Sequence, residues 1–349
     1  MQALVLAGGQ GTRLRPLTYT TPKPVMPLAG RPFLTFMLDW LRGHGVTEAI
    51  LSCGFMSDGV QAVLGDVYGG MRLRYVIEEE PLGTAGPVRL AFDEGVLEER
   101  LLVLNGDVLT DIDLTAEVAR HEATGARCTL ALIEVEDTAS YGVVPTDAEG
   151  RVEAFLEKTE GEVPTNRINA GAYVLERDVV EELVPAGRAV SFEREVFPRL
   201  VGEGLYGWAV DGYWIDIGTP ERYLEATHDL LSGTVASTLP ARDETGSLIG
   251  DGCLTSGARI GPQTVLGRHC SVGSHSSVER SVLHDGVFVG ADCRIREAVL
   301  ADRVRVGDGA RIERGAFVGA GAQLAAGAVI GEDARIDPDA VVQAEEAVE

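Results

Sequence analysis

The chain has 349 residues and a formal net charge of −24 at pH 7, which disfavours binding to nucleic acid or to an anionic membrane surface. Its length suffices for one large α/β domain and a smaller second domain. Because no apolar run is long enough to span a membrane and the first residues predict a core strand rather than a cleavable leader, we expect a cytoplasmic protein. Five cysteines without a CxxC pair indicate neither a disulfide framework nor a zinc site.

The N-terminal segment combines a buried strand, a glycine turn and several cations. The apolar run Ala3–Ala7 predicts a central strand of a parallel sheet. The glycines within Gly8–Gly11 permit positive φ and let backbone N–H groups approach an anion closely, so this turn is suited to phosphate. Arg13 and Arg15 add positive charge just beyond it, and Lys23 lies between two prolines that restrict the backbone. The segment therefore predicts a phosphate site with positioned cations.

Two other phosphate-binding motifs also follow a first strand, the GxxxxGK[ST] loop and the dinucleotide fingerprint GxGxxG. Neither spacing is present, because Thr12, Arg13 and Leu14 follow the last glycine. The segment Gly8–Thr18 together with Lys23-Pro24 instead resembles the sugar nucleotidyltransferases, or nucleotide-sugar pyrophosphorylases, whose signature is GGxGTRLxPLT followed by a KP motif.

Strands and helices alternate along the following segments. Helical spacing of apolar residues over Phe33–Leu41 precedes predicted strands at Glu48–Cys53, Met71–Val76 and Leu101–Asn105. This alternation predicts an α/β fold with a doubly wound, mostly parallel, Rossmann-like sheet. Ligands of such sheets bind at the carboxyl ends of the strands, where the glycine turn and Asn105-Gly106-Asp107 are both expected.

The acidic segment Glu78–Pro87 falls where the family binds the base and ribose, and it most resembles the version found in bacterial mannose-1-phosphate guanylyltransferases. Guanine presents two donors, N1–H and the 2-amino group, so a carboxylate acceptor such as Glu78 suits it better than uracil or thymine. A solvated acidic loop is an equally good interpretation of any single one of the three glutamates in this segment.

Two aspartates follow short apolar runs and are candidate metal ligands. Mg²⁺ prefers a few hard oxygen ligands completed by substrate phosphates. A lone aspartate at the end of a strand is more often a turn or cap residue. The resemblance to the family's N-[GS]-D motif nevertheless implies that Asp107 binds Mg²⁺, and it implies the same role for Asp216. Asp111 and Asp113 are expected to be turn and cap residues.

The segments from Tyr141 onward resemble the sugar-phosphate half of the family, in the motifs Tyr141–Val144, Phe155–Lys158 and Asn169–Val174. By this resemblance Glu157 would hydrogen-bond sugar hydroxyls, while Lys158 would neutralise the sugar phosphate. A Glu-Lys pair taken alone is usually exposed on the surface and has no functional role. The later segment Phe192–Pro198 is expected to pack under the site, without a chemical role.

The resemblance implies a complete set of site residues. The predicted nucleotide-binding residues are Leu6, Ala7, Gly8, Gly9, Gly11, Thr12, Glu78, Gly83, Thr84, Ala85, Asn105 and Gly106. The predicted sugar-phosphate-binding residues are Gly142, Glu157, Lys158, Asn169, Ala170 and Gly171. Arg13, Lys23 and Lys158 are the predicted catalytic residues, and Asp107 and Asp216 the predicted metal ligands.

A repetitive domain follows. Thr219 is expected to cap a helix over Glu221–Leu231, after which 232–246 loses apolar periodicity and is interpreted as a linker. An aliphatic residue then recurs every six residues, and a small or β-branched residue lies four positions after each; the aliphatic positions are Ile260, Leu266, Val272, Val278, Val306, Ile312, Val318, Leu324, Ile330 and Ile336. This hexapeptide repeat predicts a left-handed parallel β-helix over 247–342. The catalytic domain is then 1–231, and 343–349 form an acidic tail.

Irregularities in the repeat carry further expectations. Phase slips between Val278 and Val289, and between Ile295 and Val306, indicate one-residue deletions at corners. Cys270 and Cys293 occupy the small inward position and are therefore expected in the core. Hexapeptide coils also occur in acyltransferases that use a histidine base, but the histidines of this region fall in corner or outward slots; they are His269, His275 and His284. An oligomerising or regulatory role of the coil is the favoured interpretation.

The resemblance implies nucleotidyl transfer from a nucleoside triphosphate to a sugar 1-phosphate, most closely GTP and mannose 1-phosphate, with Mg²⁺. The alternatives are a glucose-1-phosphate thymidylyl- or uridylyltransferase and a non-catalytic regulatory homologue of the same fold. A third is additional acyltransferase activity in the coil. We expect small-molecule substrates and a homo-oligomer formed through the β-helix, with neither nucleic acid nor membrane as partner.

Overall fold

The computed structural model describes residues 1–157, 163–240 and 242–344 and divides into two compact units. The first unit comprises Met1–Gly9 and Met37–Trp214, and the second comprises Gln10–Phe36 and Ile215–Glu349. The compact units do not follow the predicted boundary after residue 231, because the segments 10–36 and 215–231 group with the repeats. The functional division into catalytic domain, linker, β-helix and tail stays a prediction.

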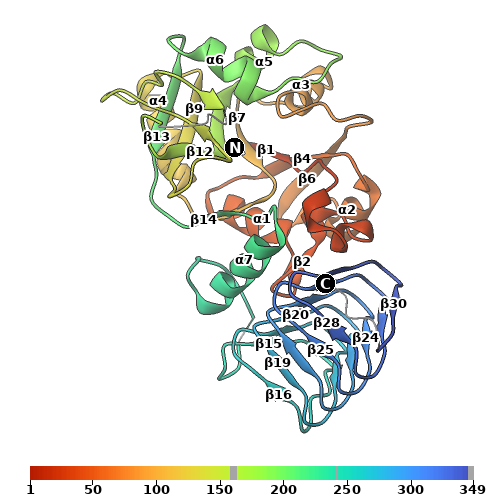
Figure 1. Cartoon of the computed structure of the whole chain (residues 1–349). Helices are drawn as coiled ribbons and strands as arrows, with labels where there is room; N and C mark the ends of the chain where they lie inside the picture. The colour runs from red at the N-terminus through yellow and green to blue at the C-terminus, as the bar shows by residue number, and fades with distance from the viewer. Residues whose placement is uncertain (158–162, 241, 345–349) are drawn as a thin grey trace. The chain divides into compact units, whose positions relative to one another are not determined.

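A ten-stranded mixed sheet forms the first unit (Figure 1). In spatial order its main path is β11 (Leu156–Glu157), β10 (Gly142–Val143), β12 (Arg167–Glu176), β7 (Arg100–Asn105), β1 (Gln2–Leu6), β4 (Glu48–Cys53), β6 (Met71–Ile77) and β5 (Val67–Tyr68). Off this path, β9 (Cys128–Glu134) pairs with β12 and with β13 (Leu205–Ala209). The central strands β7, β1, β4 and β6 are parallel, as predicted, whereas β12 runs antiparallel to β7 and β9.

Helices alternate with these strands. They are α1 (Leu34–Gly43), α2 (Ser57–Leu64), α3 (Gly86–Asp93), α4 (Leu114–Thr124), α5 (Arg177–Leu183) and α6 (Phe197–Leu200). Helix α4 packs on β9 and β12, and α3 packs on β6 and α5. Asp113 caps α4 by accepting a hydrogen bond from Ala116 N at 3.0 Å, which confirms its predicted cap role. None of the helices in the described part of the chain is long and apolar enough to cross a lipid bilayer.

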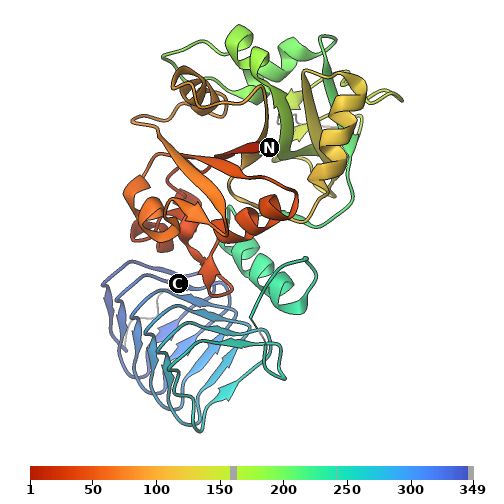
Figure 2. The same ribbon diagram turned by 180° about the vertical axis from the view of Figure 1, so that it is seen from behind.

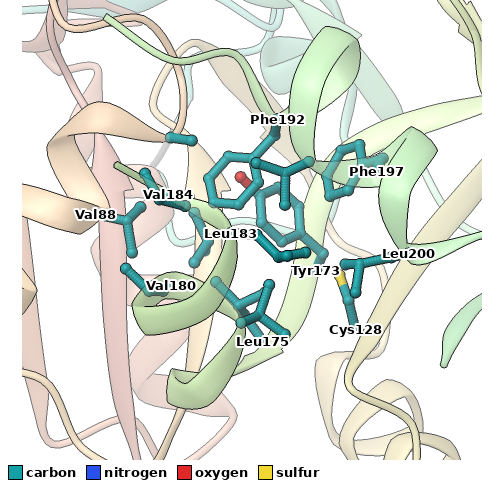
Figure 3. Packing of buried hydrophobic residues seen from close by; sticks show 14 of the residues in the cluster. Val88, Cys128, Tyr173, Leu175, Val180, Leu183, Val184, Phe192, Phe197 and Leu200 are labelled. Carbon is teal, nitrogen blue, oxygen red and sulfur yellow. The ribbon is translucent and has the colours of Figure 1, made fainter. Parts of the chain in front are cut away.

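The core of the first unit contains a cluster of aromatic rings (Figure 3). Tyr173 of β12 contacts Phe192 and Phe197 at ring-centroid distances of 5.2 and 5.4 Å, and the two phenylalanine rings stack at 5.4 Å. Phe192 lies in a π-helical turn, Phe192–Val196, that continues into α6. The predicted role of this segment in packing is therefore confirmed.

The second unit contains a β-helix, drawn from teal to blue in Figures 1 and 2. Its strands form three parallel sheets. The first sheet contains β15 (Leu248–Ile249), β17 (Val265–Leu266), β20 (Val282–Leu283), β23 (Val299–Leu300), β26 (Phe317–Val318) and β29 (Arg335–Ile336). The second contains β16 (Arg259–Ile260), β19 (Ser277–Glu279), β22 (Arg294–Arg296), β25 (Arg311–Ile312) and β28 (Val329–Ile330), and the third β18 (Ser271–Val272), β21 (Phe288–Val289), β24 (Arg305–Val306), β27 (Gln323–Leu324) and β30 (Val341–Val342). This is the predicted left-handed parallel β-helix of hexapeptide repeats.

The strand register locates the two predicted deletions. Ile260 pairs with Val278, 18 residues on, whereas Val278 pairs with Ile295, 17 residues on. Most neighbouring strands of the coil begin six residues apart, but β19 and β20, and also β22 and β23, begin only five residues apart. One residue is therefore missing in each of these two connections, at the same corner of the coil. Cys270 and Cys293 are 0% and 2% exposed inside the coil, as predicted. His284, expected in a corner or outward slot, directly follows β20 and is buried.

The outward face of the first β-helix sheet is also apolar and buried, as Val282, Val299 and Phe317 show. Helix α7 (Pro220–Ser232) contributes to this cover, since the ring of Tyr223 meets that of Phe317 edge-on with centroids 6.0 Å apart. Thr219 caps α7 as predicted, its hydroxyl accepting from Arg222 N at 3.4 Å. A hairpin of β2 (Pro27–Leu28) and β3 (Arg31–Pro32) in the same unit contacts α7. The remaining short strands are β8 (Val108–Thr110) and β14 (Trp214–Asp216).

Candidate active site

The glycine turn begins at the carboxyl end of β1. Ala7 N donates to Ser52 O of the neighbouring strand at 2.9 Å, which fixes the start of the turn. Gly9 and Gly11 have φ of 104° and 59°, so both need the freedom of glycine, as predicted. The chain passes from the first compact unit to the second after Gly9, and the candidate residues are therefore described for each unit in turn.

Glu78, at the end of β6, lies against the glycine turn within the first unit. Its Oε1 accepts from Ser52 Oγ at 2.7 Å and its Oε2 accepts from Leu82 N at 3.1 Å. A Cβ built on Gly8 would lie 2.9 Å from Oε1, so a larger residue at position 8 would have to displace this carboxylate. Glu79 and Glu80 are exposed. The interpretation as a solvated acidic loop thus suits these two residues but not Glu78.

The predicted nucleotide residues Gly83, Thr84 and Ala85 are held against a second loop of the same unit. Ala85 N donates to Val190 O at 2.9 Å, and a Cβ on Gly83 would lie 2.5 Å from that oxygen. The Thr84 hydroxyl donates to Glu193 Oε2 at 2.7 Å and accepts from Phe192 N at 2.8 Å. Because this hydroxyl is already used in the fold, a role of this loop in binding would rest on its backbone.

The Asn105-Gly106-Asp107 turn lies beside the start of the glycine turn. Leu6 of β1 pairs with Asn105 of β7, and Gly106 N donates to Leu6 O at 3.0 Å. A Cβ on Gly106 would lie 2.7 Å from the same oxygen, so the two strand ends approach this closely only because residue 106 is glycine. The predicted adjacency of the two turns is confirmed.

Asn105 also meets a bulge in β12 that carries three of the predicted sugar-phosphate residues. The β12–β9 register shifts between Asn169 and Tyr173, and Gly171 there has φ of 72°. Asn169 Oδ1 accepts from Gly171 N at 3.1 Å, and a Cβ on Gly171 would lie 2.6 Å from Asn105 Nδ2. Trp214 Nε1 donates to Ala170 O at 2.8 Å. The structure therefore brings predicted nucleotide and sugar-phosphate residues together in one unit.

Gly142 and Glu157 form a second pair of predicted sugar-phosphate residues. They face each other across the antiparallel strands β10 and β11, and a Cβ on Gly142 would lie 3.1 Å from Glu157 Oε2. The ring of Tyr141 meets that of Trp214 edge-on at 5.4 Å. Lys158, the next predicted residue, lies outside the described residues.

The second unit contains the cationic part of the signature. Thr12–Leu14 forms a 3₁₀ turn, and Thr18 Oγ1 donates to Gly11 O at 2.9 Å. A Cβ on Gly11 would lie 3.3 Å from Lys23 Cβ, which places the lysine stem against this glycine. Lys23 begins a second 3₁₀ turn, closed by a 3.0 Å hydrogen bond from Val25 N to Pro22 O.

Asp216 is surrounded by cations and N–H donors in the second unit. Its carboxylate accepts from Arg222 Nη1 at 2.8 Å and from Gly218 N at 3.1 Å. A Cβ on Gly218 would lie 2.6 Å from Arg13 Nη2 and 2.8 Å from Asp216 Oδ1, so glycine lets the Arg13 guanidinium come close to this carboxylate. The sequence did not indicate that Ser52 contacts Glu78 or that Arg222 contacts Asp216. The residue type of a serine in a strand or of an arginine in a helix does not show which side chain it will meet.

The donor chemistry fits a magnesium ion carried mainly by substrate. Asp107 and Asp216 each supply hard carboxylate oxygens, and Mg²⁺ commonly takes one or two carboxylates, with phosphates and water completing its shell. Within the described ranges no cluster of three or more His, Cys, Asp or Glu side chains could hold a metal alone.

Cys53 lies next to the candidate site but is not a nucleophile. Burial, together with the neighbouring charge of Glu78, raises the pKa of this thiol to about 12. A thiol with this pKa stays protonated near neutral pH and is unreactive.

A family model described as nucleotidyl transferase matches residues 2–233, the segment that contains every candidate residue above. The chain belongs to the nucleotidyl transferase family. A second model, described as the GlmU-like C-terminal hexapeptide, matches residues 240–313 of the β-helix. Enzymes of this nucleotidyl transferase family use a divalent metal ion.

Several curated relatives of this nucleotidyl transferase are similar over most of their length. A mannose-1-phosphate guanylyltransferase of Mycobacterium tuberculosis is 42% identical over 84% of this chain and 82% of that protein. A probable mannose-1-phosphate guanylyltransferase 2 of Arabidopsis thaliana is 35% identical over 83% of each. Among solved structures, HddC from Yersinia pseudotuberculosis is 30% identical with a TM-score of 0.56, covering 66% of this chain and 99% of that one. HddC has also been solved complexed with GMP-PN.

Proposed function

We propose that this nucleotidyl transferase is a mannose-1-phosphate guanylyltransferase, which forms GDP-mannose and pyrophosphate from GTP and mannose 1-phosphate. The observation that carries the proposal is the similarity to proteins of that name, which extends over most of both chains. The intact signature from Gly8 to Lys23 supports an active enzyme rather than a non-catalytic homologue, since its charged residues are all present.

In the proposed reaction an oxygen of the sugar 1-phosphate attacks the α-phosphorus of GTP, and pyrophosphate leaves. No protein nucleophile is required, so catalysis depends on positioning and on neutralising charge. Gly8, Gly9, Gly11 and Thr12 would bind the triphosphate through backbone donors. Arg13 would bind the leaving pyrophosphate, and Lys23 would stabilise charge at the α-phosphate.

The sugar phosphate would be held by other residues. Glu157 would hydrogen-bond sugar hydroxyls, and Lys158 would neutralise the attacking phosphate. Asn169 and the glycines at 142 and 171 would close around the hexose, a role supported by the contact of the β12 bulge with Asn105.

Asp107 and Asp216 would hold Mg²⁺, which supplies charge neutralisation at the phosphates when bound. Arg222 keeps the Asp216 carboxylate in place until then, because the two form an ion pair at 2.8 Å. The choice of Mg²⁺ among divalent ions is part of the proposal.

Selection of guanine is assigned to Glu78. Both of its oxygens already accept one hydrogen bond, and each carboxylate oxygen has a further lone pair for the N1–H and 2-amino donors. A base that lacks these two donors would form neither hydrogen bond with Glu78 and would therefore bind more weakly than guanine.

The test is pyrophosphate release with Mg²⁺ from GTP, dTTP, UTP, ATP and CTP, each combined with mannose 1-phosphate or glucose 1-phosphate. We expect strong release with GTP and mannose 1-phosphate alone. Preference for dTTP or UTP with glucose 1-phosphate would support the nucleotidyl-transfer mechanism but refute GTP and mannose 1-phosphate as the substrates. If no pair of substrates released pyrophosphate, the result would support a non-catalytic regulatory homologue. An oligomer formed through the β-helix and a cytoplasmic location stay predictions.

A further inference from the structure

The hydroxyl of Tyr223 connects three segments of the second unit. Tyr223 is 0% exposed, and its ring meets Phe317 of the β-helix. Its hydroxyl donates to Pro27 O in the β2–β3 hairpin. His284 Nε2, from the β-helix, lies 3.2 Å from the same hydroxyl oxygen. One buried polar atom thus touches α7, the hairpin and the coil.

The direction of these hydrogen bonds follows from proton counting. A carbonyl can only accept, so the single hydroxyl proton of Tyr223 is given to Pro27 O. The nitrogen of His284 that faces the hydroxyl must then be a donor, which places a proton on Nε2. Burial lowers the pKa of His284, although Asp302 and Asp285 act in the opposite direction, so a neutral ring with this proton is favoured. The chain of donors therefore runs from His284 to Tyr223 to Pro27.

Pro27 is coupled closely to Lys23. Met26 N donates to Lys23 O at 3.2 Å, and Phe33 N donates to Met26 O at 3.0 Å. These bonds join the 3₁₀ turn that begins at Lys23 to the hairpin that contains Pro27. A shift of the Pro27 carbonyl would consequently move the backbone of Lys23.

The same turn of α7 also fixes Asp216. Arg222, the neighbour of Tyr223, forms the 2.8 Å ion pair with this carboxylate. Tyr223 N donates to Thr219 O at 2.9 Å, within the first turn of the helix. The start of α7 is thus attached both to the segment of Asp216 and, through Tyr223, to the segment of Lys23.

We propose that Tyr223 is a positioning residue for nucleotidyl transfer: supported by His284, its hydroxyl holds the Lys23 segment in the geometry that the transition state needs. This inference rests on the proposed function and extends it, since it gives the β-helix a part in the reaction. Tyr223 touches no reacting atom in this role. It acts through the backbone at Pro27.

The first test is Tyr223→Phe, which removes only the hydroxyl. Leaving the Pro27 carbonyl without its donor should lower kcat roughly tenfold or more, because one hydrogen bond in a preorganised site commonly contributes that much. KM for GTP and for mannose 1-phosphate should change little, since substrate contacts are kept. Steady-state kinetics and thermal unfolding of the purified full chain measure both properties.

Tyr173→Phe is the matched control. Tyr173 is also fully buried, but its hydroxyl has no hydrogen-bond partner among the described residues. Removal of this hydroxyl should leave kcat within twofold of wild type. A comparable loss of kcat in both variants would indicate a general effect of altering a core tyrosine and would overturn the proposal.

A second pair of variants keeps the test decisive if Tyr223→Phe unfolds. His284→Gln retains an N–H donor near the Nε2 position, whereas His284→Leu removes it. We expect kcat to be kept better by His284→Gln than by His284→Leu, and Tyr223→Phe combined with His284→Leu to be no worse than Tyr223→Phe alone. Equal kcat in both His284 variants, or unchanged kcat in folded Tyr223→Phe with wild type active, would refute the inference. An inactive wild type would instead refute the proposed function.

Discussion

Lys23 has two proline neighbours that leave its backbone little freedom, and its stem packs against Gly11. A charge fixed in this way costs no reorganisation when the transition state forms. We predict that Lys23→Ala lowers turnover about 10²-fold or more, as loss of one preorganised charge contact typically does. Initial rates of pyrophosphate release with GTP and mannose 1-phosphate measure this loss.

Arg15→Ala is the control for Lys23→Ala. It removes a positive charge from the same segment, but the guanidinium of Arg15 lies over the ring of Tyr19, with its carbon 4.8 Å from the ring centroid, and Arg15 is not one of the predicted catalytic residues. Its effect on turnover should be much smaller. Near-normal turnover of Lys23→Ala would remove this lysine from the mechanism.

Single residues were predictable where a motif and a backbone requirement coincide. Gly9 and Gly11 have the expected positive φ, and Cys270 lies inside the coil as its repeat position indicates. The partners Ser52 and Arg222 were not predictable. Each reaches its carboxylate through tertiary packing, and neither its residue type nor its distance along the sequence indicates which side chain it will meet.

At the scale of elements, α4 contains a buried acid that the proposed reaction does not use. Glu117 is 1% exposed, and neither carboxylate oxygen has a hydrogen-bond partner in the part of the chain that the structure describes. Burial raises the pKa of Glu117 well above its usual value, opposed only in part by the charge of Arg120 and by the nearby backbone of Ala131. The folded chain therefore holds this proton more tightly than the unfolded chain does.

The raised pKa of Glu117 makes the free energy of unfolding depend on pH. Between the unfolded pKa and the raised folded pKa the native state binds more protons, so the contribution of Glu117 to stability falls as pH rises. We predict that Glu117→Gln increases the free energy of unfolding more at pH 9 than at pH 6, because glutamine does not titrate and so loses the pH-dependent term of the buried carboxyl; the gain should grow by up to about 1.4 kcal/mol per pH unit below the folded pKa. Urea unfolding at the two pH values measures the difference.

Glu122→Gln on the same helix is the control, because Glu122 is exposed and its ion pair with Arg100 is of a kind that contributes little. It should show no gain that grows with pH. A gain from Glu117→Gln that is the same at pH 6 and pH 9 would mean that the raised pKa is not its cause.

The bounds of helices and strands agree with the sequence-based prediction where the apolar periodicity and the boundary residues point to the same limits. Strand β4 has the predicted bounds Glu48–Cys53, and α7 begins at the predicted cap Thr219. The antiparallel direction of β12 was not predictable, because alternation of side chains is the same in either direction. It depends on which neighbours the strand finds in the folded sheet.

For the whole molecule, the two compact units have a consequence for truncation. The segment Gln10–Phe36 and helix α7 belong to the same unit as the β-helix. We predict that a chain ending at Gly233 loses soluble yield and cooperative thermal unfolding, because Tyr223 and His228 would lose their β-helix partners at Phe317 and Arg280. A soluble, cooperatively folding truncation with normal turnover would contradict this expectation and make the β-helix dispensable.

This grouping was not predictable from sequence. The signature Gly8–Lys23 is continuous, and nothing in its residue types indicates that the chain changes unit after Gly9. The hexapeptide pattern specifies the inside of the coil, whereas the cover over its outward face depends on distant segments. Repeats thus define a domain by sequence without defining what packs on it.

The outward face of the first β-helix sheet changes character at its last strand. Val299 and Phe317 are buried, but Arg335 on β29 is exposed, and its guanidinium carbon lies 5.0 Å from the centroid of the Phe317 ring. Duplication of a whole coil after Val342 would therefore lengthen the protein without disturbing Tyr223 or the hairpin. In such a chain Tyr223 would keep both of its partners in the coil, His284 after β20 and Phe317 on β26.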